Sequence, residues 1–134
     1  MVYLIHFRVF ARLLDFDGFF PNRIAELKLS FEEEVLKNSS VILELAYKDL
    51  EAKAMTFINL TTVLSRIVLM NDKYLEYFYD NIPTLIHSCK ENIGMIRKNS
   101  ALLLARLSKS EKNREFIRSL HGIEILQSIA KYIS

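Results

Sequence analysis

The stretch NSALLLARLSKSEKNREFIRSLHGIEILQSI, residues 99–129, belongs to a run of three helical patterns separated by short breaks. The patterns cover Asn99–Ser108, Glu111–His121 and Gly122–Ile133. Apolar residues recur every three or four positions in each pattern, as they do on the buried face of a helix. Ser110 precedes the second pattern, where its hydroxyl can cap the first helical turn. Gly122 separates the second from the third, since glycine is favoured just past a helix end. The stretch therefore predicts short helices joined by tight turns.

The earlier part of the chain has the same helical spacing. It covers Phe31–Lys48, Asp49–Met70, Asn71–Asn81 and a segment that begins near Pro83. The 134 residues include three glycines and two prolines, which is too few for the frequent turns of an all-β fold. The single cysteine, Cys89, excludes an internal disulfide. We therefore expect one all-α domain that covers residues 1–134.

Two pairs of segments resemble each other at a nearly constant offset. NLTTVLSRI (residues 59–67) aligns with NSALLLARL (residues 99–107) at an offset of 40. NIPTL (residues 81–85) aligns with GIEIL (residues 122–126) at an offset of 41. Self-similarity at such a period, in helical segments, is typical of α-helical repeat proteins.

In these motifs and their spacing the sequence resembles armadillo repeats. The related HEAT repeats are the alternative. The resemblance is clearest over residues 71–133 and extends more loosely to residues 1–70, where VFARLLDF (residues 9–16) resembles a third helix of a repeat. It implies a short right-handed α-solenoid of about three degenerate repeats. Residues 1–48 would form its divergent N-terminal part and residues 49–134 its clearer repeats.

The resemblance also implies a concave groove lined by third helices. In armadillo proteins, asparagines of these helices hold the backbone of an extended peptide. Arg106 stands where such an asparagine is expected, Arg66 stands at the corresponding place one repeat earlier, and Leu102 takes a position where the family often has tryptophan. Arginine donates hydrogen bonds but accepts none, and its planar fork suits carboxylates. We predict as partner-binding residues Arg12, Arg66, Arg106, Asn59, Asn99, Ile58 and Leu102. In the alternative, the arginines pair with neighbouring acids and only space the repeats.

The stretch RLLDFDGFFPN, residues 12–22, resembles the Asp-x-Asp-Gly opening of haloacid-dehalogenase-type phosphatases. That motif needs a buried strand before Asp15 and a hydroxyl after the glycine. Charged residues interrupt the apolar run before Asp15, and Phe19 stands in place of the hydroxyl. His87 and Cys89 form one close pair of soft ligands, but zinc requires three or four. We therefore predict no catalytic residues, metal site or cofactor.

The sequence thus predicts a non-enzymatic interaction module or scaffold that binds an acidic, extended segment of another protein. A co-chaperone or assembly factor that grips a folded domain is the alternative. A less favoured alternative is an RNA-binding helical repeat, because the net charge of residues 87–134 is about +5. A phosphatase that uses Asp15 is also less favoured.

The first ten residues, MVYLIHFRVF, are almost wholly apolar, which suggests a homodimer through this N-terminal helix. They lack a basic leader and a small-residue cleavage site, so we expect no signal peptide. No uncharged apolar run approaches the length of a membrane span, and we expect a cytoplasmic or nuclear protein.

Overall fold

The computed structural model describes residues 32–133 of the chain. The elements in this range are α3 (Glu32–Lys48), α4 (Leu50–Met70), the 3-10 helix η1 (Asp72–Asn81), α5 (Ile82–Glu91), α6 (Gly94–Leu107), α7 (Glu111–Ser119) and α8 (Gly122–Ile133). The range contains no strand, so the all-α prediction is confirmed for it. Most predicted helix ends agree closely with the observed ones. The main differences are that α6 begins at Gly94, before its predicted start, and that Asp72–Asn81 forms a 3-10 helix.

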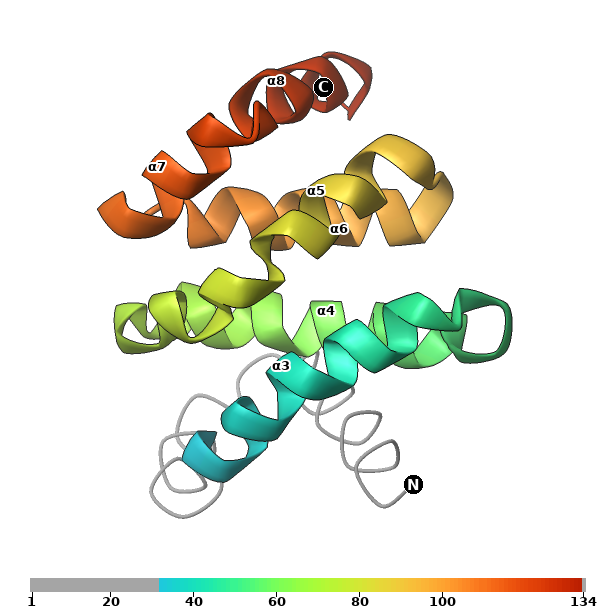
Figure 1. Ribbon diagram of the computed structural model, residues 1–134, viewed down its shortest axis with the longest axis vertical. Helices are drawn as coiled ribbons and strands as arrows, with labels where there is room; N and C mark the ends of the chain where they lie inside the picture. Colours follow the sequence, from blue (N-terminus) through green and yellow to red (C-terminus); the bar gives the residue numbers. More distant parts are fainter. Residues whose placement is uncertain (1–31, 134) are drawn as a thin grey trace, which may run out of the picture.

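The helices are stacked in tiers along the long axis of the molecule (Figure 1). The first tier holds α3 and α4, the next holds α5 and α6, and the last holds α7 and α8. Helices α4 and α6 pack side by side, α3 packs on α4, and α5 packs on α6 in the same way. Since η1 contacts α3, α4, α5, α6 and α7, it links all the tiers.

Hydrogen bonds between neighbouring tiers join residues about 40 positions apart. They link Ser40 with Asn81, Tyr47 with His87, Ile58 with Asn99, and Ser65 with Arg106, at separations of 41, 40, 41 and 41 residues. These separations match the offsets of 40 and 41 between the similar sequence segments. The contacts of α3 with η1 and α5, and those of α4 with α6, therefore each join segments that lie one such shift apart along the chain.

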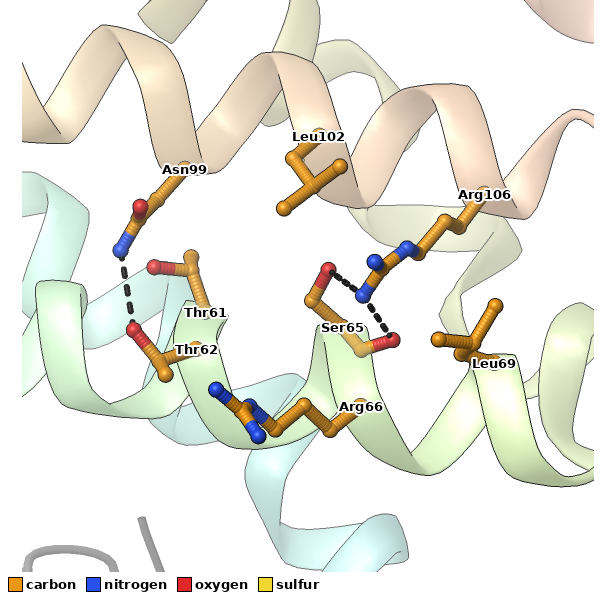
Figure 2. A pocket seen from close by; sticks show the side chains of 8 residues that line it. All are labelled: Thr61, Thr62, Ser65, Arg66, Leu69, Asn99, Leu102 and Arg106. Atoms are coloured by element: carbon orange, nitrogen blue, oxygen red, sulfur yellow. Dashed lines mark hydrogen bonds between the residues drawn. The ribbon is translucent and has the colours of Figure 1, made fainter. Parts of the chain in front are cut away.

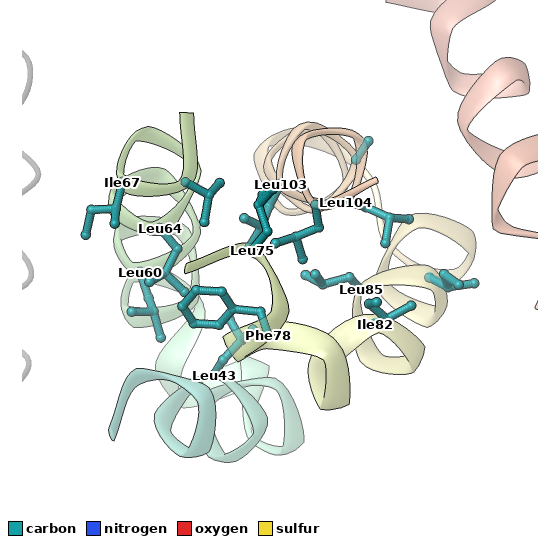
Figure 3. Packing of buried hydrophobic residues seen from close by; sticks show 14 of the residues in the cluster. Leu43, Leu60, Leu64, Ile67, Leu75, Phe78, Ile82, Leu85, Leu103 and Leu104 are labelled. Carbon is teal, nitrogen blue, oxygen red and sulfur yellow. The ribbon is translucent and has the colours of Figure 1, made fainter. Parts of the chain in front are cut away.

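A continuous apolar core joins the tiers (Figure 3). Phe78 of η1 is fully buried, and in Figure 3 its ring points toward the leucines of α4. The core also contains Leu43 of α3, Leu60 and Leu64 of α4, and Leu103 of α6. Because each helix buries only one stripe, the core forms only when adjacent tiers are in contact.

Helix α4 is the one helix among residues 32–133 that is long and apolar enough to cross a membrane. Half of its most apolar window is buried inside the molecule. Buried residues such as Phe57, Leu60 and Leu64 account for its apolar character. A core helix of a globular protein passes the same test, so this feature does not indicate a membrane protein.

The turn between α7 and α8 was predicted at Gly122, but the structure assigns it a different role. The left-handed residue is His121, with φ of 61°, and no positive φ is recorded for Gly122. A Cβ atom at Gly122 would lie 2.6 Å from Cγ2 of Ile117 and 3.0 Å from Cδ1 of Ile86. Glycine is therefore required at residue 122 because α8 approaches α5 and α7 closely there.

We predict opposite effects of substitution at these two adjacent positions. Gly122→Ala should lower the free energy of unfolding by about 1–3 kcal/mol, because the new methyl overlaps Ile117. His121→Gly should raise it by about 0.5–1 kcal/mol, because glycine removes the cost of the left-handed conformation. Urea unfolding followed by circular dichroism measures both. A stabilised Gly122→Ala variant would contradict the assignment.

Candidate functional site

A pocket of about 350 Å³ lies between α4 and α6 (Figure 2). Its lining residues are Thr61, Thr62, Ser65, Arg66 and Leu69 of α4, and Asn99, Leu102 and Arg106 of α6. Thr62, Arg66 and Leu69 are four and three residues apart, so they lie on the same face of α4. On α6, Leu102 lies between Asn99 and Arg106 and points toward α4 (Figure 2). The pocket thus combines two cations, hydroxyl groups and two leucines.

The side chain of Arg106 spans the pocket from α6 to α4. Its Nη1 atom donates to the backbone oxygen and to the hydroxyl oxygen of Ser65, both at 2.9 Å (Figure 2). The guanidinium is therefore held in one orientation by two acceptors on the neighbouring helix. No carboxylate pairs with it among the described residues. In the alternative expected from the sequence, each arginine pairs with a neighbouring acid. Among the described residues, Arg106 bonds to Ser65 instead.

Asn99 fixes the other end of the pocket. Its Nδ2 atom donates to the backbone oxygen of Ile58 at 3.2 Å and to the hydroxyl of Thr62 at 3.0 Å. The Thr62 hydroxyl in turn donates to the Ile58 oxygen at 2.8 Å. Both amide hydrogens of Asn99 are thus used within the protein, and its role here is to hold α6 against α4.

The pocket carries positive charge without a compensating acid in its lining. Arg66 and Arg106 are both half-buried, and none of the lining residues is Asp or Glu. Burial lowers the pKa of the Arg106 guanidinium below its ordinary value, and the positive charge of Arg66 lowers it further. Arginine remains protonated at neutral pH even so. The charge of Arg66 therefore disfavours the charged form of Arg106, and an anion bound near Arg106 would favour it.

The structure brings four of the seven predicted site residues together. Arg66, Arg106, Asn99 and Leu102 line the pocket, while Ile58 contributes its backbone oxygen to Asn99 from outside the lining. Asn59 does not line the pocket, and its buried Nδ2 atom has no hydrogen-bond acceptor among the described residues. Arg12 lies outside the described residues.

Sequence reasoning missed four lining residues, namely Thr61, Thr62, Ser65 and Leu69. One signal could have found two of them. Thr62 and Leu69 are one turn before and one turn after Arg66, on the same face of α4, so choosing Arg66 as a groove residue implies them as well.

The basic residues of the C-terminal third are distributed over α5, α6, α7 and the turn before α7. They are Lys90, Arg97, Lys98, Lys109, Lys112, Arg114 and Arg118. Lys109 forms an ion pair with Asp72 at 2.9 Å, and the Lys112 ammonium lies 4.6 Å from the ring centre of Tyr79. The others are spread over α5, α6 and α7.

The other candidate chemistry of the sequence does not assemble in the described residues. His87 accepts or donates a hydrogen bond of 2.6 Å with the Tyr47 hydroxyl, while Cys89 is buried in the core. No group of three His, Cys, Asp or Glu residues within 32–133 could hold a metal ion. Asp15 lies outside this range, and the range contributes no strand to the sheet that a phosphatase site requires.

Comparisons with protein-family models, with curated proteins and with solved structures gave no match.

We predict that Arg106→Met lowers the free energy of unfolding by about 1–2 kcal/mol. Methionine keeps most of the aliphatic length but cannot donate to Ser65, so the α4–α6 contact loses two hydrogen bonds. The matched control is Arg114→Met, since Arg114 is exposed on α7 and its substitution should change stability by less than about 0.5 kcal/mol. Equal stabilities of the two variants in urea would show that the Arg106 bonds do not hold the helices together.

We also predict a pH dependence that originates at Cys89. Burial raises the pKa of its thiol to about 12, and the nearby charge of Arg97 lowers it only in part. An unfolded cysteine has a pKa near 8.5, so its contribution to stability is intact below about pH 8.5 and is lost as the pH rises toward 12. Between pH 8 and pH 10 the wild type should lose about 1–2 kcal/mol more unfolding free energy than Cys89→Ala. Parallel losses in urea titrations of the two proteins would contradict this.

Proposed function

We propose that this chain is a non-enzymatic protein-interaction module that binds an acidic segment of another protein in the pocket between α4 and α6. The observation that carries the proposal is the guanidinium of Arg106, which is fixed by Ser65 in an open pocket whose lining contains no acid. A carboxylate is the common protein group that accepts two parallel hydrogen bonds from one guanidinium ion.

We further propose that the tiers are armadillo-like repeats of a short right-handed solenoid. Contacts that recur at 40 and 41 residues support this arrangement, as does the equivalent packing of α3 on α4 and of α5 on α6. In this scheme α4 and α6 are third helices of successive repeats. The pocket then lies on the concave surface, where armadillo proteins bind extended peptides.

The fixed guanidinium of Arg106 is suited to recognise a carboxylate. Because Nη1 is held by Ser65, the plane of the guanidinium is set before the ligand arrives, and less side-chain entropy is lost on binding. The structure records no other hydrogen bond from Arg106 to a described residue, which leaves Nε and Nη2 as donors to a bound carboxylate. Arg66 adds a second cation at the α4 side of the pocket (Figure 2).

Two leucines beside the arginines provide apolar contacts for the same ligand. Leu102 is 43% exposed and Leu69 is 62% exposed, and both line the pocket. Buried apolar anchors contribute most of the affinity of a typical interface, whereas charges set its register and association rate. We therefore expect a ligand with an acidic residue flanked by an apolar one.

Selection from a random library of extended peptides tests the proposal. We expect the selected peptides to be enriched in Asp and Glu next to apolar residues. Binding, measured by fluorescence anisotropy, should weaken at least tenfold in Arg106→Gln, which loses charge-assisted hydrogen bonds to the ligand, and in Arg66→Glu, which places a negative charge in the lining of the pocket. It should also weaken with added salt, since the pocket is open to solvent.

Arg118→Glu is the matched control, because Arg118 is exposed on α7 outside the pocket. This variant makes the same charge change and should keep its affinity within about twofold. Circular dichroism of each variant separates loss of binding from loss of helix. Peptides without acidic enrichment, or equal losses in Arg66→Glu and Arg118→Glu, would contradict an acid-binding site in this pocket.

A further inference from the structure

A second, larger groove of about 570 Å³ lies between α6 and α8, and it differs in character from the pocket described above. Its lining residues are Lys98, Ala101, Leu102 and Ala105 of α6, and Leu126, Gln127, Ile129 and Ala130 of α8. Six of these eight side chains are aliphatic. No described helix covers the groove, although α4 covers the opposite flank of α6.

The face of α6 in this groove is equivalent to the face of α4 that receives α6. Shifting the α6 lining residues back by 40 positions gives Ile58, Thr61, Thr62 and Ser65 of α4. All four contact α6, either by accepting hydrogen bonds from Asn99 and Arg106 or by lining the shared pocket. The groove is therefore the place on α6 where a further helix would pack in the way that α6 packs on α4.

The chemistry of the groove restricts which helix fits. Thr61, Thr62 and Ser65 of α4 correspond to Ala101, Leu102 and Ala105 of α6, so every hydroxyl group of the first face is replaced by an aliphatic one. Asn99 of α6 donates to the Thr62 hydroxyl. A helix in the groove would meet Leu102 there and requires an apolar residue in place of that asparagine.

The N-terminal segment of the chain meets this requirement. Ala11-Arg12-Leu13 aligns with Ala105-Arg106-Leu107 of α6, an offset of 94 residues. At this offset Ile5 stands in place of Asn99. Val9, Phe10 and Leu13 stand in place of the core residues Leu103, Leu104 and Leu107. Residues 1–16 thus have the apolar stripe of a third helix and lack the polar group that the groove cannot satisfy. They lie outside the described residues.

We propose that the groove between α6 and α8 binds residues 1–16 of a second copy of this chain. Helix α3, which follows this segment in sequence, lies at one end of the stack, and α8 lies at the other (Figure 1). Contacts between the N-terminal segment of one copy and the groove of the next join different surfaces, so the association is head-to-tail. This inference uses neither Arg66 nor Arg106, although Leu102 lines both the groove and the acidic-ligand pocket.

Mixing two complementary variants of the full chain tests the proposal by analytical ultracentrifugation. Ala105→Arg places a charge in the groove, and Phe10→Glu places one on the apolar stripe of the N-terminal segment. The wild type should associate with increasing concentration, and each variant alone should associate at least about 30-fold more weakly. The mixture should form a one-to-one dimer, because the intact groove of Phe10→Glu can bind the intact segment of Ala105→Arg. That dimer cannot extend further.

Met95→Arg is the matched control, because Met95 is an exposed residue of α6 outside the groove. It should associate like the wild type. A synthetic peptide of residues 1–16 provides a second measurement that does not depend on folding of the variants. It should bind the Phe10→Glu protein and should not bind the Ala105→Arg/Phe10→Glu double variant.

Three results would overturn the proposal. The first is a wild type that stays monomeric at concentrations of several hundred micromolar, as a segment docked on its own chain or a groove reserved for another protein would produce. The second is self-association that survives Ala105→Arg. The third is a mixture of the two variants that stays monomeric while both proteins remain helical by circular dichroism.

Discussion

Two side chains of α6 donate hydrogen bonds to backbone oxygens of α4, and the register of α6 on α4 depends on this pair of contacts. Asn99 bonds to Ile58 and Arg106 bonds to Ser65, so donors seven residues apart meet acceptors seven residues apart. Two whole turns of each helix are thus matched, and α4 and α6 must run in the same direction. Hydrogen bonds are directional, so they fix the register of the two helices more narrowly than apolar contact alone. Parallel neighbours also require a return path, which η1 and α5 provide.

The two sites beside α6 differ because corresponding positions of α4 and α6 carry different side chains. Where α6 lies on α4, hydroxyl groups and backbone oxygens of α4 are used by Asn99 and Arg106, and the space left between them is polar and positively charged. The corresponding face of α6, about 40 residues further along the chain, carries aliphatic side chains in place of these hydroxyl groups and is apolar. A charged ligand therefore suits the first site and an apolar helix suits the second. The chemical difference comes from three substitutions on a shared geometry.

Helical periodicity, with a few turn residues, was enough to place the helices between residues 32 and 133. Ser110 caps α7 as predicted, with its hydroxyl accepting from the backbone of Asn113, because a cap is a local interaction. The turn at residues 121 and 122 was placed correctly for the wrong reason. Local preference explains glycine there by its backbone freedom, whereas the structure requires it because Ile117 and Ile86 approach from other helices. Such contacts cannot be inferred from the residues next to Gly122 in the sequence.

The sequence by itself determined the helices, the offset near 40, and the choice of Arg66 and Arg106 as equivalent positions, because all three follow from local spacing and self-similarity. Only the tertiary structure decided what those positions do. It showed that Asn99 and Arg106 bind the neighbouring helix, that Leu102 separates them, and that Ile58 and Asn59 stay outside the pocket. It also showed which face of α6 is left uncovered. Each of these depends on which helices become neighbours, and that is decided by the combined burial of many apolar stripes.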